Sequence, residues 1–145
     1  MNDESPANIV AFRQMVLLVA QQLYEKLPTP IDLDPLTLDQ KLIPVDASFD
    51  ETFDRFGVAA DTIRWLAHEG FLRYDSQDIS KKFHNLVLSK QGLALLESAS
   101  VLPSSGGKPT SFIDRVRKAA KESGGKVAVD LAAKLVAELI KGLAS

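Results

Sequence analysis

The chain has 145 residues, of which 46% are hydrophobic, 25% charged and 7% aromatic, a composition too apolar for intrinsic disorder and too charged for an integral membrane protein. The formal net charge is -2, so the chain is not a polycation that binds nucleic acid through its overall charge. Cysteine is absent, which excludes disulfides, thiolate metal sites and thiol catalysis.

Charge is distributed unevenly along the chain. Residues 1–110 contain 10 Lys and Arg against 15 Asp and Glu, whereas residues 111–145 contain 7 against 4. The stretch 102–111 is rich in Pro, Gly and Ser, which is typical of a linker. We therefore expect a mildly acidic module over residues 1–101, a linker over 102–111 and a basic helical tail over 112–145.

The first expected element is a helix over residues 8–27. Ser5 or Asn8 can cap its first amides, and the prolines that follow it end it. Its apolar residues cover most of the circumference, so we expect it to pack against more than one partner. The next stretch, 31–45, contains two prolines and is expected to be extended or looped, with room for a short strand.

Two short helices are expected next. The first covers residues 48–56, where Phe49, Phe53 and Phe56 share one face and predict a buried stripe. The second begins at Ala59 or Ala60, runs to Glu69 and is ended by the glycine that follows.

A hairpin and a further helix complete the module. Strand-like segments at 71–74 and 83–88 flank a polar loop, 75–82, which is the pattern of a hairpin with a long tip. Ser89 is then expected to cap a helix over residues 90–98.

Two segments of this module resemble winged helix-turn-helix proteins. The spacing of Leu66, Gly70 and Leu72 in Thr62-Ile-Arg-Trp-Leu-Ala-His-Glu-Gly-Phe-Leu72 is similar to the end of their third helix and their first wing strand. The run Leu86-Val-Leu-Ser-Lys-Gln-Gly-Leu-Ala-Leu-Leu96 resembles their second wing strand and the helix after it. The resemblance covers about residues 8–98. It implies a mainly α fold with a small β-hairpin, here a winged helix-turn-helix module plus a C-terminal helical tail. Because winged helices bind DNA, RNA or protein, it does not by itself imply one function.

The outer face of the second short helix is a candidate protein-binding surface. A helical projection places Ala59, Thr62, Ile63 and Leu66 toward the core. It leaves four residues as the partner-binding face: Asp61, Arg64, Trp65 and His68. Trp and Arg are enriched at interface hot spots, which favours a protein partner. In the alternative interpretation, Trp65 packs inside the chain against the 48–56 helix or the hairpin.

A nucleic-acid role is the second interpretation of the same region. In a DNA-reading winged helix, the contacts would come from Arg64, Arg73, Lys81, Lys82 and His84. The preceding helix and its approach carry four acids against one cation: Asp46, Asp50, Glu51 and Asp54 against Arg55. These acids would repel the phosphates that a duplex-binding surface has to neutralise. The charge of this region therefore favours a protein partner over a DNA partner.

The tail combines a cationic half with an apolar half. Residues 112–127 are amphipathic, and a break is expected near Gly124-Gly125 because the apolar pattern changes phase there. From 127 to 143 the helix is apolar over about three-quarters of its surface and needs a neighbour. We expect self-association through Leu131, Leu135, Val136, Leu139 and Ile140. Packing against the 8–27 helix of the same chain is one alternative. Membrane-surface binding is the other, through Arg115, Arg117, Lys118 and Lys121.

No pattern typical of catalysis or metal binding is found in the sequence. His68 and His84 lack a partner at ligand spacing, and neither a phosphate-binding loop nor a nucleophile elbow is present. We therefore expect no enzyme activity, no cofactor and no metal. The acidic start lacks the basic region of a signal peptide, and no apolar run approaches the roughly 20 residues of a membrane span. A cytoplasmic protein is expected.

These patterns lead to three hypotheses. The first is a non-catalytic winged-helix protein-interaction module that self-associates through its N-terminal and C-terminal helices as a homo-oligomer. The second is a dimeric winged-helix transcriptional regulator that binds DNA. The third, which the tail charges favour least, is peripheral association with a membrane surface.

Overall fold

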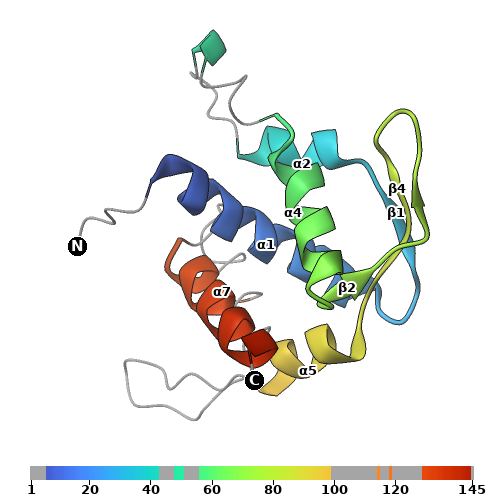
Figure 1. Ribbon diagram of the computed structural model, residues 1–145, viewed down its shortest axis with the longest axis vertical. Helices are drawn as coiled ribbons and strands as arrows, with labels where there is room; N and C mark the ends of the chain where they lie inside the picture. The colour runs from blue at the N-terminus through green and yellow to red at the C-terminus, as the bar shows by residue number, and fades with distance from the viewer. Residues whose placement is uncertain are drawn as a thin grey trace.

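The computed structural model describes residues 6–42, 48–50, 56–98 and 129–144, and the single positions 114 and 118. Over these residues the protein is mainly helical with a small antiparallel sheet (Figure 1). The predicted linker 102–111, the break near Gly124-Gly125 and most of the cationic half of the tail lie outside the described residues.

Helix α1, Ala7–Lys26, is the centre of the fold. It packs against α4 and against α7, which fulfils the expectation of more than one partner (Figure 1). The predicted side-chain cap is not observed, because Pro6 occupies the capping position and Asn8 lies within the first turn. The buried face takes up most of the helix: Ala11, Met15, Val16, Leu17, Leu18, Val19, Ala20 and Leu23.

Helix α7, Val129–Ala144, lies beside α1 in the same chain. Ala132, Leu135 and Val136 are buried in the common core. Leu135 and Val136, two of the residues predicted for self-association, are thus buried within the single chain, in which α7 packs against α1. Ile140 is 54% exposed. Leu131 and Leu139 belong to α7, but their side chains are not among those described.

The stretch 31–45 contains a helix that the sequence pattern did not reveal. Strand β1, Ile31–Leu33, is followed by α2, Pro35–Lys41. Asp34 starts this helix, since its Oδ1 accepts a 3.0 Å hydrogen bond from the backbone N–H of Leu36, and Pro35 occupies the first turn. The helix is too short to show a clear apolar period, which explains why an extended segment was expected.

Helix α4, Val58–His68, begins after Gly57, whose φ of 91° is left-handed. The four residues projected toward the core are all buried: Ala59, Thr62, Ile63 and Leu66. The buried stripe expected in the preceding helix is wrong at two of its positions, because Phe49 is 82% exposed and Phe56 is 47% exposed. Phe53 lies outside the described residues. Periodicity shows that side chains share a face, but not that another element covers that face.

The hairpin region consists of three strands, and the last of them also pairs with β1. β2, Leu72–Arg73, and β4, Phe83–Leu88, confirm the predicted hairpin, and β4 lies between β1 and β2. β3, Ser76–Gln77, also pairs with β4 and lies within the stretch 75–82 that the sequence predicts as a loop. Leu33 pairs with Phe83 and Ile31 with Leu86, so β4 has one extra residue opposite β1. That bulge contains Asn85, whose φ is 58°.

Helix α5, Lys90–Ser98, starts at the predicted cap. The Ser89 Oγ accepts a 3.1 Å hydrogen bond from the backbone N–H of Gly92 and donates a 2.8 Å hydrogen bond to the carbonyl of Phe71. Gly92 lies so close to that carbonyl that a Cβ there would be 2.2 Å from the Phe71 oxygen. The glycine is therefore required by close packing between α5 and the start of β2.

Candidate interaction surface

The outer face of α4 carries an arginine that is already engaged. Asp61 and Arg64 are exposed and form an ion pair one turn apart. The Arg64 Nη1 also donates a 2.9 Å hydrogen bond to the Oε1 of Gln77 in β3. His68 is exposed at the end of the helix. Arg64 therefore joins α4 to the hairpin, and the carboxylate of Asp61 balances its charge.

Trp65 is partly exposed, and the rest of its side chain packs against α1. Its ring meets that of Phe12 edge to face, with centroids 5.1 Å apart and planes at 87°. It therefore packs inside the chain against α1, whereas most of the 48–56 segment, one of the partners expected in the alternative interpretation, lies outside the described residues. Only part of the ring faces solvent at the border of the α4 face.

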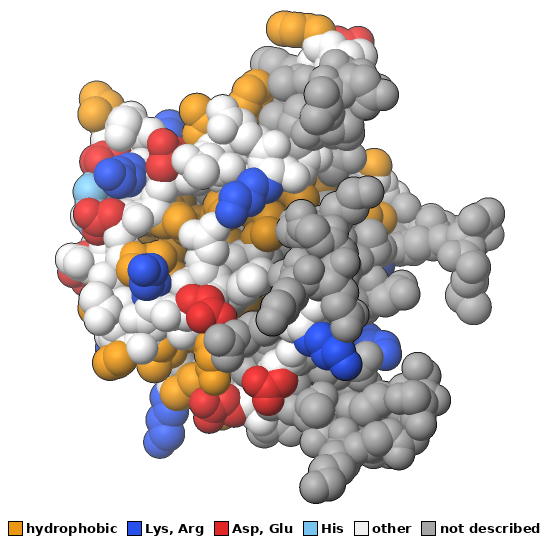
Figure 2. Space-filling view, turned by 180° about the vertical axis from the view of Figure 1, so that it is seen from behind, with side chains coloured by type: hydrophobic (Ala, Val, Ile, Leu, Met, Phe, Trp, Pro, Cys, Tyr) orange, Lys and Arg blue, Asp and Glu red, His pale blue; other side chains and the backbone are white. Residues whose placement is uncertain are grey.

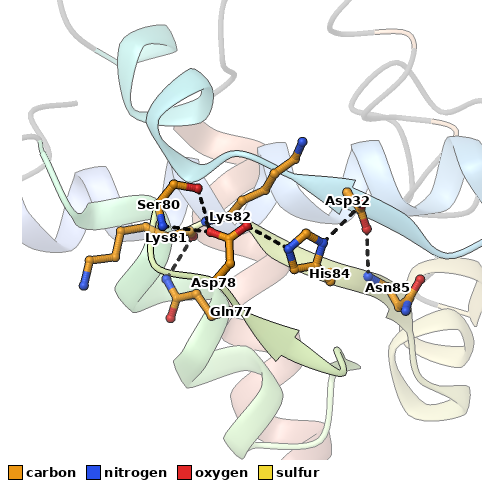
Figure 3. Close-up of polar contacts among 8 residues, drawn as sticks. All are labelled: Asp32, Gln77, Asp78, Ser80, Lys81, Lys82, His84 and Asn85. Atoms are coloured by element: carbon orange, nitrogen blue, oxygen red, sulfur yellow. Dashed lines mark hydrogen bonds and ion pairs between the residues drawn. The ribbon is translucent and has the colours of Figure 1, made fainter.

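The hairpin tip, which we define as residues 78–82, is organised by Asp78. Its Oδ1 accepts hydrogen bonds from the backbone N–H of Ser80 at 2.9 Å, from the Ser80 hydroxyl at 2.6 Å and from the backbone N–H of Lys82 at 3.1 Å (Figure 3). The amide of Gln77 donates to the carbonyl of Lys81, whose φ is 77°. These contacts give the polar loop a defined shape.

His84 joins three parts of the chain. Its Nε2 lies 2.8 Å from the Asp78 Oδ2, and its Nδ1 lies 3.3 Å from the Asp32 Oδ2 in β1 (Figure 3). The pKa of His84 is raised above 6.5 by its hydrogen bonds to Asp78 and then to Asp32, because both carboxylates accept from the ring and favour the imidazolium. Both ring nitrogens of His84, a residue predicted as a possible nucleic-acid contact, therefore face carboxylates of the same chain.

The pKa values of the two carboxylates that face His84 are lowered. Hydrogen bonds from Ser80 and then His84 lower the pKa of Asp78 to about 2. The backbone N–H of Asn85 and then His84 lower the pKa of Asp32. Both acids are therefore ionised over the whole range in which His84 changes its charge.

The tip presents one apolar side chain between charged ones. Ile79 is fully exposed at 101%. Lys81, Lys82 and, on β2, Arg73 are also exposed. The sequence analysis did not single out Ile79, although it is the one apolar residue in the polar loop 75–82. An apolar residue isolated in a polar loop is a signal that could have identified it.

Positive and negative charges are balanced over α4 and the hairpin. Residues 58–88 contain four cations and four acids. The cations are Arg64, Arg73, Lys81 and Lys82, and the acids are Asp61, Glu69, Asp75 and Asp78. At the edge of the molecule where the hairpin lies, red and blue side chains are intermixed and form no patch of one sign (Figure 2).

Other candidate sites are few among the described residues. In that part of the chain no group of three or more metal-ligating side chains is arranged to hold a metal ion, and no helix there combines the length and apolarity of a membrane span. An open pocket of about 560 Å³ lies between α1, β1 and α2. Its lining mixes aliphatic, amide and charged groups: Leu18, Gln21, Gln22, Glu25, Lys26, Ile31 and Lys41.

The membrane hypothesis depends on the cationic half of the tail. Of the four cations expected to bind the membrane surface, Lys118 alone is described, as an exposed helical residue. Arg115, Arg117 and Lys121 lie outside the described residues.

Comparisons with models of protein families, with curated proteins and with solved structures found nothing that matches this chain.

Proposed function

We propose that this protein is a non-catalytic interaction module with a winged helix-turn-helix layout. The order α1, β1, α2, α4 and then the hairpin, with β4 between β1 and β2, supports that layout. In it, α4 corresponds to the third helix and the hairpin tip to the wing. The resemblance in residues 62–72 and 86–96 supports the same assignment.

We propose further that the module binds a protein partner through α4 and the hairpin tip. The observation that carries this is the engagement of Arg64, which pairs with Asp61 and donates to Gln77. A duplex-binding surface gains affinity by neutralising several phosphates with available cations. A surface with as many acids as cations instead suits a partner of mixed charge, with Ile79 and the exposed edge of Trp65 as apolar contacts.

DNA binding is the second candidate function. Lys81, Lys82 and Arg73 are exposed on one hairpin, which is the observation in its favour. Self-association through α7 is a weaker candidate than the sequence indicated, because α1 covers Leu135 and Val136 in cis.

Site-specific photocrosslinking in cells tests the proposed function. A photoreactive amino acid placed at Ile79 or at His68 should capture the same protein partner. The same amino acid at Lys134, which is exposed on α7, is the matched control and should capture nothing in common with them. A capture pattern that is identical at all three positions contradicts the proposal.

A duplex titration separates the two candidates. Fluorescence anisotropy with a random 30-base-pair duplex at low salt should show no binding tighter than about 10 µM, since few phosphates can be neutralised. Binding tighter than about 1 µM that weakens steeply with salt and is lost when Lys81 and Lys82 are both changed to Glu supports DNA binding instead.

A further inference from the structure

We propose that Asp32, His84 and Asp78 form a protonation-dependent clamp that ties the hairpin tip to the Asp32 side chain of β1 and releases that side chain when His84 loses its proton. The clamp concerns the conformation of the hairpin. Its test therefore does not depend on whether the partner proposed above is a protein or DNA.

The fold places the histidine between its two acids by means of the bulge in β4. The extra residue in that strand interrupts the alternation of side chains, since Phe83, Leu86 and Leu88 are buried whereas His84 and Asn85 are not. The backbone N–H of Asn85 donates a 3.1 Å hydrogen bond to the Asp32 Oδ1. The other oxygen of Asp32 is thereby turned toward the His84 ring (Figure 3).

Both contacts can exist together only when His84 is charged. An imidazolium donates from both ring nitrogens, whereas a neutral imidazole has one N–H and one lone pair. The ionisable groups facing His84 are Asp32 from β1 and Asp78 from the tip, and Lys82 acts on Asp32. Once the proton leaves, one carboxylate faces a lone pair and is repelled.

The two sides of the clamp are unequal, which determines the side that opens. Asp78 lies closer to the ring, at 2.8 Å, and is held by Ser80 and Lys82. Asp32 lies 3.3 Å from the ring and is 49% exposed, so water can replace its contact with the ring. We therefore expect neutral His84 to keep its proton on Nε2, toward Asp78, and to release Asp32.

The directions of the pKa values define the range of pH in which the clamp is closed. The pKa of His84 is raised, so its contribution is complete below the ordinary value of 6.5 and is lost as the pH rises through the raised value. The pKa values of both acids are lowered, so their contribution is complete above 3.8 and is lost on acidification. The clamp is closed between these limits and opens above the raised His84 pKa.

An NMR titration of the full chain tests the clamp. The ring signals of His84 should titrate with a midpoint above 6.5, and the backbone amides of Asp32 and Asn85 should shift with the same midpoint. Above it, long-range proton–nitrogen spectra should show the Nε2–H tautomer. Because this measurement uses the unaltered chain, it needs no variant to fold.

Two variants localise the effect. Asp32→Asn should lower the His84 midpoint by about 0.5 unit or more, since it removes a nearby opposite charge. Asp34→Asn is the matched control, because Asn caps a helix as well as Asp does and Asp34 bonds to Leu36 rather than to His84. A wild-type midpoint at or below 6.5, the Nδ1–H tautomer above it, or equal effects of the two variants would overturn the clamp.

Discussion

The buried carboxylate of Asp39, on α2, accepts a 2.8 Å hydrogen bond from the backbone N–H of Ala59, at the start of α4. Its second oxygen accepts a 3.0 Å bond from the backbone N–H of Gly57. Gly57 has no side chain to cap its own helix, so a residue of another helix satisfies these amides. Helices α2 and α4 are thereby held in one orientation.

Replacing Asp39 with Ala should lower the free energy of unfolding by about 2–4 kcal/mol, because two amides lose their acceptor in a largely buried place. Urea unfolding followed by circular dichroism measures this. The exposed neighbour Gln40→Ala is the control and should change stability by less than about 0.5 kcal/mol. Equal urea midpoints for the two variants would show that the hydrogen bonds from Gly57 and Ala59 to Asp39 contribute little to stability.

Gly92→Ala should destabilise the protein by about 2 kcal/mol or more, although alanine is the better helix former. The added Cβ would be 2.2 Å from the carbonyl oxygen of Phe71, which is backbone and cannot turn aside. Ala94→Gly, at an exposed position of α5, should cost only about 1 kcal/mol. Thermal unfolding compares the two, and a Gly92→Ala protein as stable as the wild type contradicts the close packing of α5 on Phe71.

Leu135→Ala should destabilise the chain by about 2–5 kcal/mol, the usual cost of a cavity in a core. Since α7 packs on α1 of the same chain, the urea midpoint of the wild type should stay constant over a tenfold range of protein concentration. Lys134→Ala, at an exposed position of α7, is the control. A wild-type midpoint that rises with concentration would show that α7 packs on a second copy.

Asp78→Ala should speed hydrogen exchange at the backbone amides of Ser80 and Lys82, which lose their acceptor. In the wild type the same loss should occur only as the pH falls from 3.8 toward about 2, because the lowered pKa keeps Asp78 ionised above that range. Exchange measured by NMR checks both statements. The amide of Leu93, which donates to the carbonyl of Ser89 in α5, is an internal reference and should not change.

Several elements were predictable from the sequence because neighbouring residues determine them. The positions of α1, α4, β4 and α5 followed from apolar period, from Gly70 and from the Ser89 cap. Helix α2 was missed because seven residues show too little periodicity. The exposure of Phe49 and Phe56 was missed because a shared face carries no information about what covers it.

The candidate site depended on contacts between residues distant in the sequence. The pairing of Phe12 with Trp65, the position of His84 between Asp32 and Asp78, and the burial of Leu135 by α1 each join separate elements. The sequence by itself therefore determined the local elements, their order and the near balance of charge, because these depend on residues close together in the chain. Tertiary structure alone decided which carboxylates face His84 and which helix covers α7, because packing and the β4 bulge set those distances.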